Sequence, residues 1–310
     1  MSADGRSRAW TPRLALIIGI AAVSSGSVFV RFAQSDAPSL TIAAFRLAIA
    51  ALILLPLAWR NYRQELRGIR AGQWGWFIAS GLFLAIHFAT WISSLEYTSV
   101  ASSVALVSTS PLWVTLIAWI IWREPLTPSL LIGLALALCG SVIISLAEAR
   151  SAISSRPLLG NALALAGALA VSGYWLVGRR LRRHFSLVSY VTLVYGAAAL
   201  FLLGAALLFG QPLTGFKAPT YGWFLLLALL PQLLGHSSFN WALGHLPASY
   251  VAIATLGEPI GAAILAFLFL SETPSLLKVS AAALILAGIL LALQRKPVDR
   301  AKGISQVSSF

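Results

Sequence analysis

Ten apolar segments of about 20 residues follow one another along the chain, and they decide which folds are possible. A segment of this length suits an α-helix that crosses the ~30 Å hydrocarbon core of a bilayer. Membrane barrels would instead show ~10-residue segments of alternating polarity. We therefore expect an all-α polytopic membrane protein with ten transmembrane helices. They are expected at 14–33, 38–59, 74–94, 99–121, 128–147, 158–178, 187–209, 221–243, 248–270 and 275–293.

The composition excludes a soluble globular domain and a nucleic-acid-binding protein. Hydrophobic residues make up 59% of the chain and charged residues only 10%, against roughly 25% charged residues in soluble domains. The net charge is +13, but the basic residues gather in short clusters between the apolar segments, as the positive-inside rule describes. The lipid bilayer, and not nucleic acid, is therefore the expected surrounding.

The second half of the chain repeats the first half at a constant offset of 148 residues. Residue types that are uncommon in such a chain recur at this offset. The matched pairs are Arg31 and Arg179, Pro111 and Pro259, Glu124 and Glu272, and Gly140 and Gly288. A period of about half the chain indicates the duplication of a whole half, and not a solenoid. The first repeat is expected at 14–147 and the second at 158–293.

The distribution of basic residues predicts the orientation of the repeats. With the tails 1–13 and 294–310 placed in the cytoplasm, sixteen of the 22 Lys and Arg residues lie on the inner side and five on the outer side, as the positive-inside rule requires. Each repeat holds five segments, so the two repeats must enter the membrane from opposite sides. Inverted repeats of this kind are typical of secondary transporters, whose substrate site lies near the midplane between the halves.

The matched residues resemble the motif order of a known family. Ser110-Pro111, Glu124 and Gly140 in the first repeat correspond to Glu258-Pro259, Glu272 and Gly288 in the second. This order resembles the EamA family of the drug/metabolite transporter superfamily, over nearly the whole chain. The aromatic-rich sequence is most similar to family members that export aromatic and other amino acids. The resemblance implies a bacterial inner-membrane exporter of small amino acids that works by alternating access.

Glu258 is the first candidate substrate contact. An ionisable group in the middle of a span costs about 2.5–3.5 kcal/mol on insertion scales for the related Asp, so it should face a cavity or a partner. Pro259 has no N–H to donate and Gly257 is flexible, so we expect a local break in the helix. Glu258 is expected to bind an amino group or to act as a protonatable switch; a structural hydrogen bond is the alternative. Pro111 is the matched hinge.

Two matched helices carry polar and aromatic side chains at a spacing of four residues. His87 and Trp91 share one face of the third span, and His236 and Asn240 share one face of the eighth. Across the pseudo-two-fold axis these faces should oppose each other and bind substrate. A histidine that only donates a hydrogen bond between helices is the alternative.

Further candidates come from the first, fourth and sixth spans. Tyr174 and Trp175 offer aromatic walls to the substrate, while Ser24, in the matched stretch of the first span, leaves room opposite them. Ser108 lies beside the carbonyl group of Val107 that Pro111 leaves without a donor. Plain packing between small residues is the alternative for this group.

Two charged features are expected to be structural. Arg46 is the only Arg placed deep in a span, where a bidentate contact with a carboxylate is one option; snorkelling or pairing with a carbonyl group is favoured. Glu124 and Glu272 end matched spans and are interpreted as helix-terminus features. Neither of these two glutamates is assigned to the site.

Other functions stay open at this stage. The substrate could be another small metabolite or a drug, although a multidrug pump should carry more than one acidic residue in its spans. An intramembrane enzyme could use His87, His236 and Glu258 with Ser108 or Ser110 as nucleophile, and a channel is a third option. No phosphate loop, dinucleotide fingerprint or metal-ligand spacing is present in the sequence, so no cofactor and no metal are expected. A small-molecule substrate is the expected partner, with protons as a second candidate.

Overall fold

The computed structural model describes the chain outside residues 1–3, 123–127, 150–155, 247–250, 252–254 and 294–310. Within this part every regular element is a helix. The elements are α1 (Asp4–Ser24), α2 (Gly26–Ala33), α3 (Ser39–Asn61), α4 (Arg63–Arg67), α5 (Ala71–Tyr97), α6 (Val100–Val107), α7 (Ser110–Trp122), α8 (Pro128–Ala149), α9 (Pro157–Leu181), α10 (Leu187–Leu208), α11 (Ala218–Leu227), the π-helix η1 (Ala228–His236), α12 (Ser237–Leu243), the 3-10 helix η2 (Thr255–Gly257), α14 (Glu258–Leu270) and α15 (Leu276–Leu293).

The helices have the length and the surface of membrane-spanning segments. In the described part of the chain, seven are long and apolar enough to cross a bilayer, and three shorter apolar helices lie at Leu131–Gly140, Glu258–Leu270 and Leu276–Gly288. Large apolar side chains point outward, such as Leu200, Leu208 and Leu276, which are 72%, 81% and 82% exposed. An apolar surface of this extent is unfavourable in water and suits lipid. The expectation of an all-α multi-pass membrane protein is confirmed.

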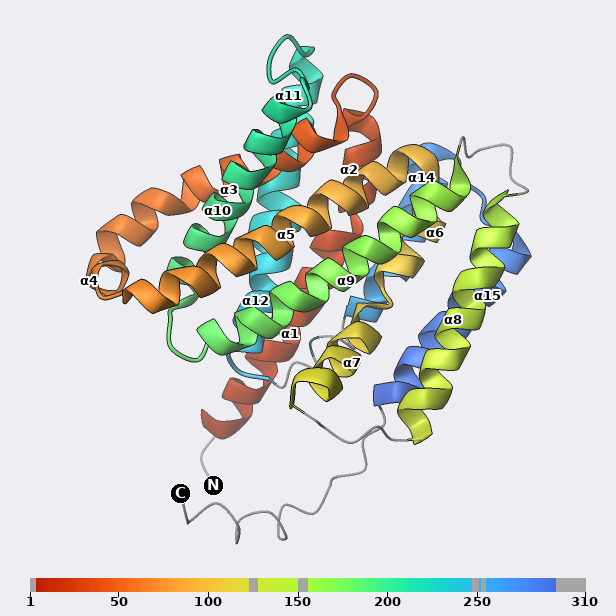
Figure 1. Ribbon diagram of the computed structural model, residues 1–310, viewed down its shortest axis with the longest axis horizontal. Helices are drawn as coiled ribbons and strands as arrows, with labels where there is room; N and C mark the ends of the chain where they lie inside the picture. Colours follow the sequence, from red (N-terminus) through yellow and green to blue (C-terminus); the bar gives the residue numbers. More distant parts are fainter. Residues whose placement is uncertain (1–3, 123–127, 150–155, 247–250, 252–254, 294–310) are drawn as a thin grey trace, which may run out of the picture.

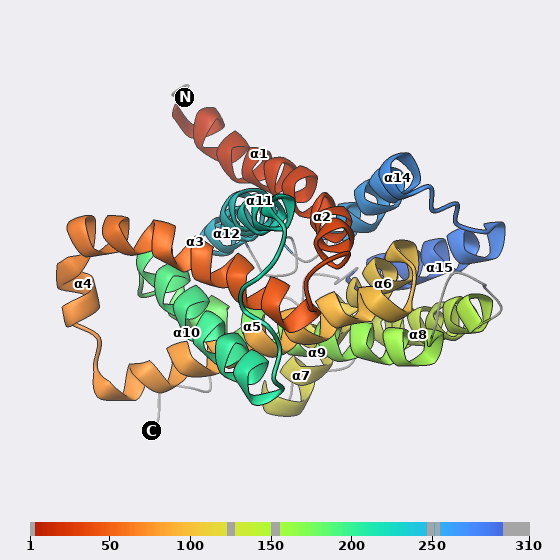
Figure 2. The same cartoon turned by 90° about the horizontal axis from the view of Figure 1, so that it is seen from above.

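Helices that are far apart in the sequence pack as neighbours (Figures 1 and 2). Helix α3 lies along α10, α5 lies along α9, and α8 lies along α15. The α8–α15 pair stands at one side of the bundle, on the right in Figure 1, beside α6 and α9. The core between α3, α5, α9 and α10 contains the buried rings of Phe88, Tyr190 and Tyr195. The pairs α3–α10, α5–α9 and α8–α15 each join a helix of the first half of the chain to a helix of the second half.

The matched glycines of the repeat lie where α8 and α15 approach most closely. A Cβ atom on Gly140 would lie 2.8 Å from the carbonyl oxygen of Ala281, and one on Gly288 would lie 2.6 Å from the carbonyl oxygen of Gly133. Both neighbours are backbone atoms, which cannot move aside as a side chain can. The small residues therefore allow the close backbone contact that holds membrane helices together.

We expect Gly288→Ala to destabilise the protein by about 1–3 kcal/mol, the usual cost of overpacking a filled interface. Thermal unfolding of the detergent-solubilised protein measures the change. Gly204→Ala is the matched control, because a Cβ atom on Gly204 of helix α10 would meet nothing within 4 Å. There the better helix propensity of Ala should raise the unfolding temperature slightly. Equal unfolding temperatures for both variants would contradict a tight α8–α15 contact.

Three spans are interrupted within the described part of the chain. The first span is broken at Ser25 into α1 and α2, and the fourth is broken at Ser108 and Thr109 into α6 and α7. Near Gly257, where a break was expected, η2 ends at Gly257 and α14 begins at Glu258, with Pro259 in its first turn. Proline suits this position because the first N–H groups of a helix have no partner within it. The second halves of both matched spans thus begin at Ser110 and at Glu258.

Candidate functional site

A cavity lies among the interrupted helices and collects polar, charged and aromatic side chains. It contains about 40 Å³ of space open to water-sized molecules, enough for a few waters. Its walls come from both halves of the chain. They are formed by Val23, Arg46, His87, Trp91, Val107, Ser108, Ser110, Val171, Trp175, His236, Phe239, Thr255 and Glu258.

Glu258 enters the cavity from the first turn of α14. The positive end of a helix dipole favours a carboxylate at this position. Arg46 lines the same cavity. The cavity therefore holds one acidic and one basic side chain among apolar walls, an arrangement that suits a ligand with charged groups and an apolar body.

His87 has a defined orientation on the wall formed by α5. Its Nδ1 lies 2.9 Å from the carbonyl oxygen of Gly167 on α9. Because a carbonyl oxygen only accepts hydrogen bonds, Nδ1 must carry the proton, which leaves Nε2 of the neutral ring as an acceptor. The ring lies parallel to that of Trp91, with the centroids 6.1 Å apart and 2° between the planes. His87 and Trp91 therefore lie on the same face of α5.

His236 faces this wall from the π-helix η1. Its ring centroid is 6.4 Å from that of His87 and 5.3 Å from that of Phe88. Pro231 lies inside η1 and cannot donate a backbone hydrogen bond. The π-helix is rare and is frequently found at functional sites. The predicted opposition of the third and eighth spans is thus present for His87 and His236.

Large aromatic side chains close much of the remaining wall. Trp91, Trp175 and Phe239 come from α5, α9 and α12 and are 5%, 6% and 3% exposed. Ser108 and Ser110 lie opposite, at the break between α6 and α7. The hydroxyl of Ser108 donates to the carbonyl oxygen of Val104 at 2.8 Å, so it is satisfied locally while it lines the cavity.

Six of the nine predicted substrate contacts line the cavity, and three do not. Asn240 donates from Nδ2 to the hydroxyl of Tyr174 at 2.7 Å and lies behind the wall with it. Tyr174 in turn stacks on Tyr190, with the ring centroids 6.3 Å apart. Ser24 donates to the carbonyl oxygen of Ile20 at 2.8 Å and packs against Gly261. These three residues support the helix contacts around the cavity. The predicted hinge residues Pro111, Gly257 and Pro259 lie at the helix breaks beside it.

Arg46 lines the cavity, although the interpretation of the sequence favoured a purely structural role for it. It is 1% exposed, and its guanidinium carbon lies 4.1 Å from the ring centroid of Phe88. Its Nε donates to Oε1 of Gln232 at 2.8 Å. The useful signal in the sequence was its isolation, since Arg46 is the only Arg expected deep within a span.

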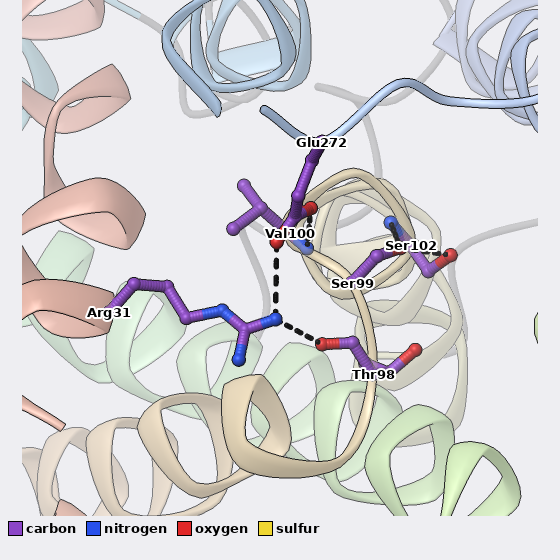
Figure 3. Close-up of polar contacts among 6 residues, drawn as sticks. All are labelled: Arg31, Thr98, Ser99, Val100, Ser102 and Glu272. Carbon is purple, nitrogen blue, oxygen red and sulfur yellow. Dashed lines mark hydrogen bonds and ion pairs between the residues drawn. The ribbon is translucent and has the colours of Figure 1, made fainter. Parts of the chain in front are cut away.

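A second polar cluster joins three helices at one end of the bundle (Figure 3). Arg31 at the end of α2 donates to Oε1 of Glu272 at 3.1 Å and to the carbonyl oxygen of Thr98 at 3.3 Å. Oε2 of Glu272 accepts from the backbone N–H of Val100 at 2.9 Å, so it also caps the start of α6. The side chains of Arg31 and Glu272 are 25% and 12% exposed. Glu272 thus links the end of α14 to two elements of the first half.

The left-handed backbone conformation of Ser271 directs Glu272 toward this cluster. Ser271, at the end of α14, has φ 55°, which is uncommon for a residue with a Cβ atom. The turn lets the N–H of Glu272 donate to the carbonyl oxygen of Ala266 at 3.3 Å. From the sequence, Glu272 was interpreted as a helix-terminus feature. Its partner Arg31 lies 241 positions away in the chain and could be identified only in the folded protein.

Among the described residues no group of three or more His, Cys, Asp and Glu side chains could hold a metal ion. The polar groups of the cavity are a guanidinium, a carboxylate, two imidazoles and a few hydroxyls. This set suits recognition of a small ligand by charge and hydrogen bonding.

Comparison with known proteins places both halves of the chain in one family. The model of the EamA-like transporter family matches residues 11–146 and again residues 158–294. A solved crystal structure covers 90% of this chain and 96% of its own, with a TM-score of 0.63 at 20% identity. The architecture of the bundle is therefore shared with a protein of known structure.

Several curated proteins are similar in sequence. A protein named uncharacterized transporter, from Archaeoglobus fulgidus, is 23% identical over 85% of this chain and 91% of its own length. The uncharacterized transporter YetK of Bacillus subtilis is 28% identical over 65% of this chain and 62% of its own length. A riboflavin transporter of Brucella anthropi is 29% identical over 42% of this chain and 45% of its own length. The chain is a multi-pass membrane transporter that belongs to the EamA-like transporter family.

Proposed function

We propose that this transporter exports small amino acids, including aromatic ones, across the bacterial inner membrane by alternating access. The observation that carries the proposal is the cavity, where the half-buried side chain of Glu258 stands among aromatic walls. The ammonium group of an amino acid would pair with Glu258. The substrate side chain would lie against Trp175, Trp91 and Phe239, because aromatic rings favour stacked or edge-to-face neighbours.

The proposed mechanism uses two inverted repeats of five helices, 14–147 and 158–293, with both tails in the cytoplasm. The two separate matches of the family model support this division. Residues matched by the repeat also have similar surroundings, which supports the same division. Gly140 on α8 contacts α15, and Gly288 on α15 contacts α8. Ser110 and Glu258 are the first residues of α7 and α14. Repeats related in this way can rock against each other around a central site.

The size of the cavity supports a moving structure. Space of about 40 Å³ holds a few waters, while small-molecule sites usually measure about 300–1,000 Å³. The helices must therefore separate on one side to admit an amino acid. In the proposed orientation, Arg31 and Glu272 lie at the outer end and join α2, α6 and α14. Their ion pair would keep that end closed while the cytoplasmic end opens.

We expect purified protein in liposomes to catalyse saturable counterflow of labelled phenylalanine. Excess unlabelled phenylalanine inside the vesicle should draw the label inward, because a carrier exchanges substrate across a single site. Riboflavin serves as a second substrate, since one relative carries that name. The label is recovered and identified after transport.

The outcomes of this assay separate the alternatives. Recovery of unchanged phenylalanine supports a carrier, while a chemically altered product would support an intramembrane enzyme. Counterflow of riboflavin or of cationic drugs without counterflow of amino acids would replace the proposed substrate. Flux that does not saturate would indicate a channel. Repeating the assay with and without a pH gradient tests the coupling to protons.

A further inference from the structure

Arg46 stands out among the buried charged groups of the bundle. It lies in α3 with 1% of its surface exposed, and it lines the cavity. A guanidinium remains charged in proteins and has five N–H donors. Burial of such a group is costly unless its charge and its donors find partners. The partners of Arg46 therefore show whether the folded protein alone satisfies it.

The contacts of Arg46 are incomplete within the described part of the chain. Nε donates to Oε1 of Gln232 at 2.8 Å, and the guanidinium lies over Phe88, 4.1 Å from the ring centroid. Nη1 is buried and has no hydrogen-bond partner among the described residues. The amide nitrogen Nε2 of Gln232 is also buried and has no hydrogen-bond partner among the described residues. Two buried donor groups from α3 and η1 thus lack acceptors beside the cavity.

The geometry points to Arg46 as the group that binds the carboxylate of the transported amino acid, a proposal that rests on the proposed function. A guanidinium forms two parallel hydrogen bonds with a carboxylate, which is the strongest neutralising contact available to it. Gln232 and Phe88 hold the guanidinium plane from two sides, so little side-chain freedom is lost on binding. The Nε2 amide of Gln232 can add a donor to the same anionic group.

The position of Glu258 fits this assignment. Glu258 and Arg46 line one cavity. A zwitterion presents an ammonium and a carboxylate on the same carbon, so one acidic and one basic group in the cavity match its charges. His87 and His236 also line the cavity and can offer hydrogen bonds to the substrate beside these two charged groups.

Binding at Arg46 would also connect the two halves of the protein. Arg46 lies on α3 in the first half, whereas Gln232 and Glu258 lie on η1 and α14 in the second half. A carboxylate between Arg46 and Gln232 and an ammonium at Glu258 would give both halves contacts with one substrate. Occupancy would then favour one relative position of the halves over another, as differential binding requires.

The test compares ligands with and without a carboxylate. Phenylalanine and phenethylamine differ only by this group, and both compete with labelled phenylalanine for the protein in liposomes. In the wild type we expect phenylalanine to compete at least about tenfold better. In Arg46→Gln this preference should disappear, and in Arg46→Lys it should be partly kept, since Lys supplies a charge without the bidentate geometry.

A matched variant separates binding from a structural role. Gln232→Leu removes the acceptor that holds Nε of Arg46 but leaves the guanidinium charge. If Arg46 binds the carboxylate, Gln232→Leu retains a reduced preference for phenylalanine, whereas Arg46→Gln retains none. If Arg46 only holds α3 to η1, both variants weaken the two ligands equally and leave their ratio at the wild-type value.

Each result decides the matter. An unchanged ligand ratio in Arg46→Gln, measured on protein that remains monodisperse in detergent, overturns the assignment and leaves the proposed function intact. Should Arg46→Gln fail to fold, Arg46→Met replaces it, because Met has a similar length and no charge, and a wild-type ratio there is equally decisive against the assignment. If the wild type binds neither ligand, the amino-acid function and the assignment fall together.

Discussion

Glu258→Gln is expected to weaken the binding of phenylalanine at least about 30-fold and to reduce its transport accordingly. Removing one member of a buried charge pair costs about 2–5 kcal/mol, and 1.4 kcal/mol corresponds to a tenfold change in affinity. Gln preserves the size of the side chain in the first turn of α14. Loss of the negative charge would leave the ammonium group of the substrate without a counter-ion. Counterflow and competition binding in liposomes measure the effect.

Glu96→Gln is the matched control for this experiment. Glu96 accepts a hydrogen bond from Ser39 and lies outside the cavity walls. Removal of this carboxylate should leave the affinity for phenylalanine within about threefold of the wild type, since surface charge changes contribute little. Equal affinities for the wild type and Glu258→Gln would remove Glu258 from the binding site.

Breaking the Arg31–Glu272 ion pair is expected to increase access, by at least about tenfold, to the end of the bundle that the proposed orientation places outside. A hydrogen bond between charged groups contributes about 1.5–3 kcal/mol, and 1.4 kcal/mol changes a ratio of states tenfold. A reporter cysteine at Ala266, which is 1% exposed beneath Glu272, is introduced after Cys139→Ser. The rate of labelling from outside the cell by an impermeant maleimide then reports opening, in the wild type and in Arg31→Ala and Glu272→Gln.

The controls for the ion pair use the same reporter. Glu96→Gln removes a carboxylate from α5 that accepts a hydrogen bond from Ser39 of α3, in the same half, and it should leave the labelling rate unchanged. The double variant Arg31→Ala with Glu272→Gln should label little faster than either single variant, because both remove one contact. Labelling rates that add independently, or that stay at the wild-type value, would show that the pair does not hold the outer end closed.

Much of the cavity lining could be predicted from the sequence, because few polar side chains are tolerated within a membrane span. A charged or strongly polar group in a span is costly unless it faces a cavity or a partner. Glu258, His87 and His236 stood out for this reason, and the structure brings them together. Helical spacing then added Trp91, four residues after His87. Trp175 and Ser108 were suggested by the neighbouring small residues and by the proline break.

The same reasoning was less successful where several partners are available to a side chain. Asn240 and Tyr174 have the right residue types, but they satisfy each other at 2.7 Å behind the cavity wall. Ser24 bonds within its own helix and contacts Gly261. Periodicity shows which residues share a face, but the neighbour of that face depends on how the helices rotate and cross.

The sequence by itself determined the class of the protein, since apolar length, the positions of the basic residues and the 148-residue offset follow from local composition and from duplication. It also located the breaks at Pro111 and Pro259, because proline acts on its own helix. The tertiary structure alone decided the partners of Arg46 and Glu272. Arg46 meets Gln232 across 186 positions, and Glu272 meets Arg31 across 241. Such contacts depend on the packing of whole helices, which no local pattern encodes.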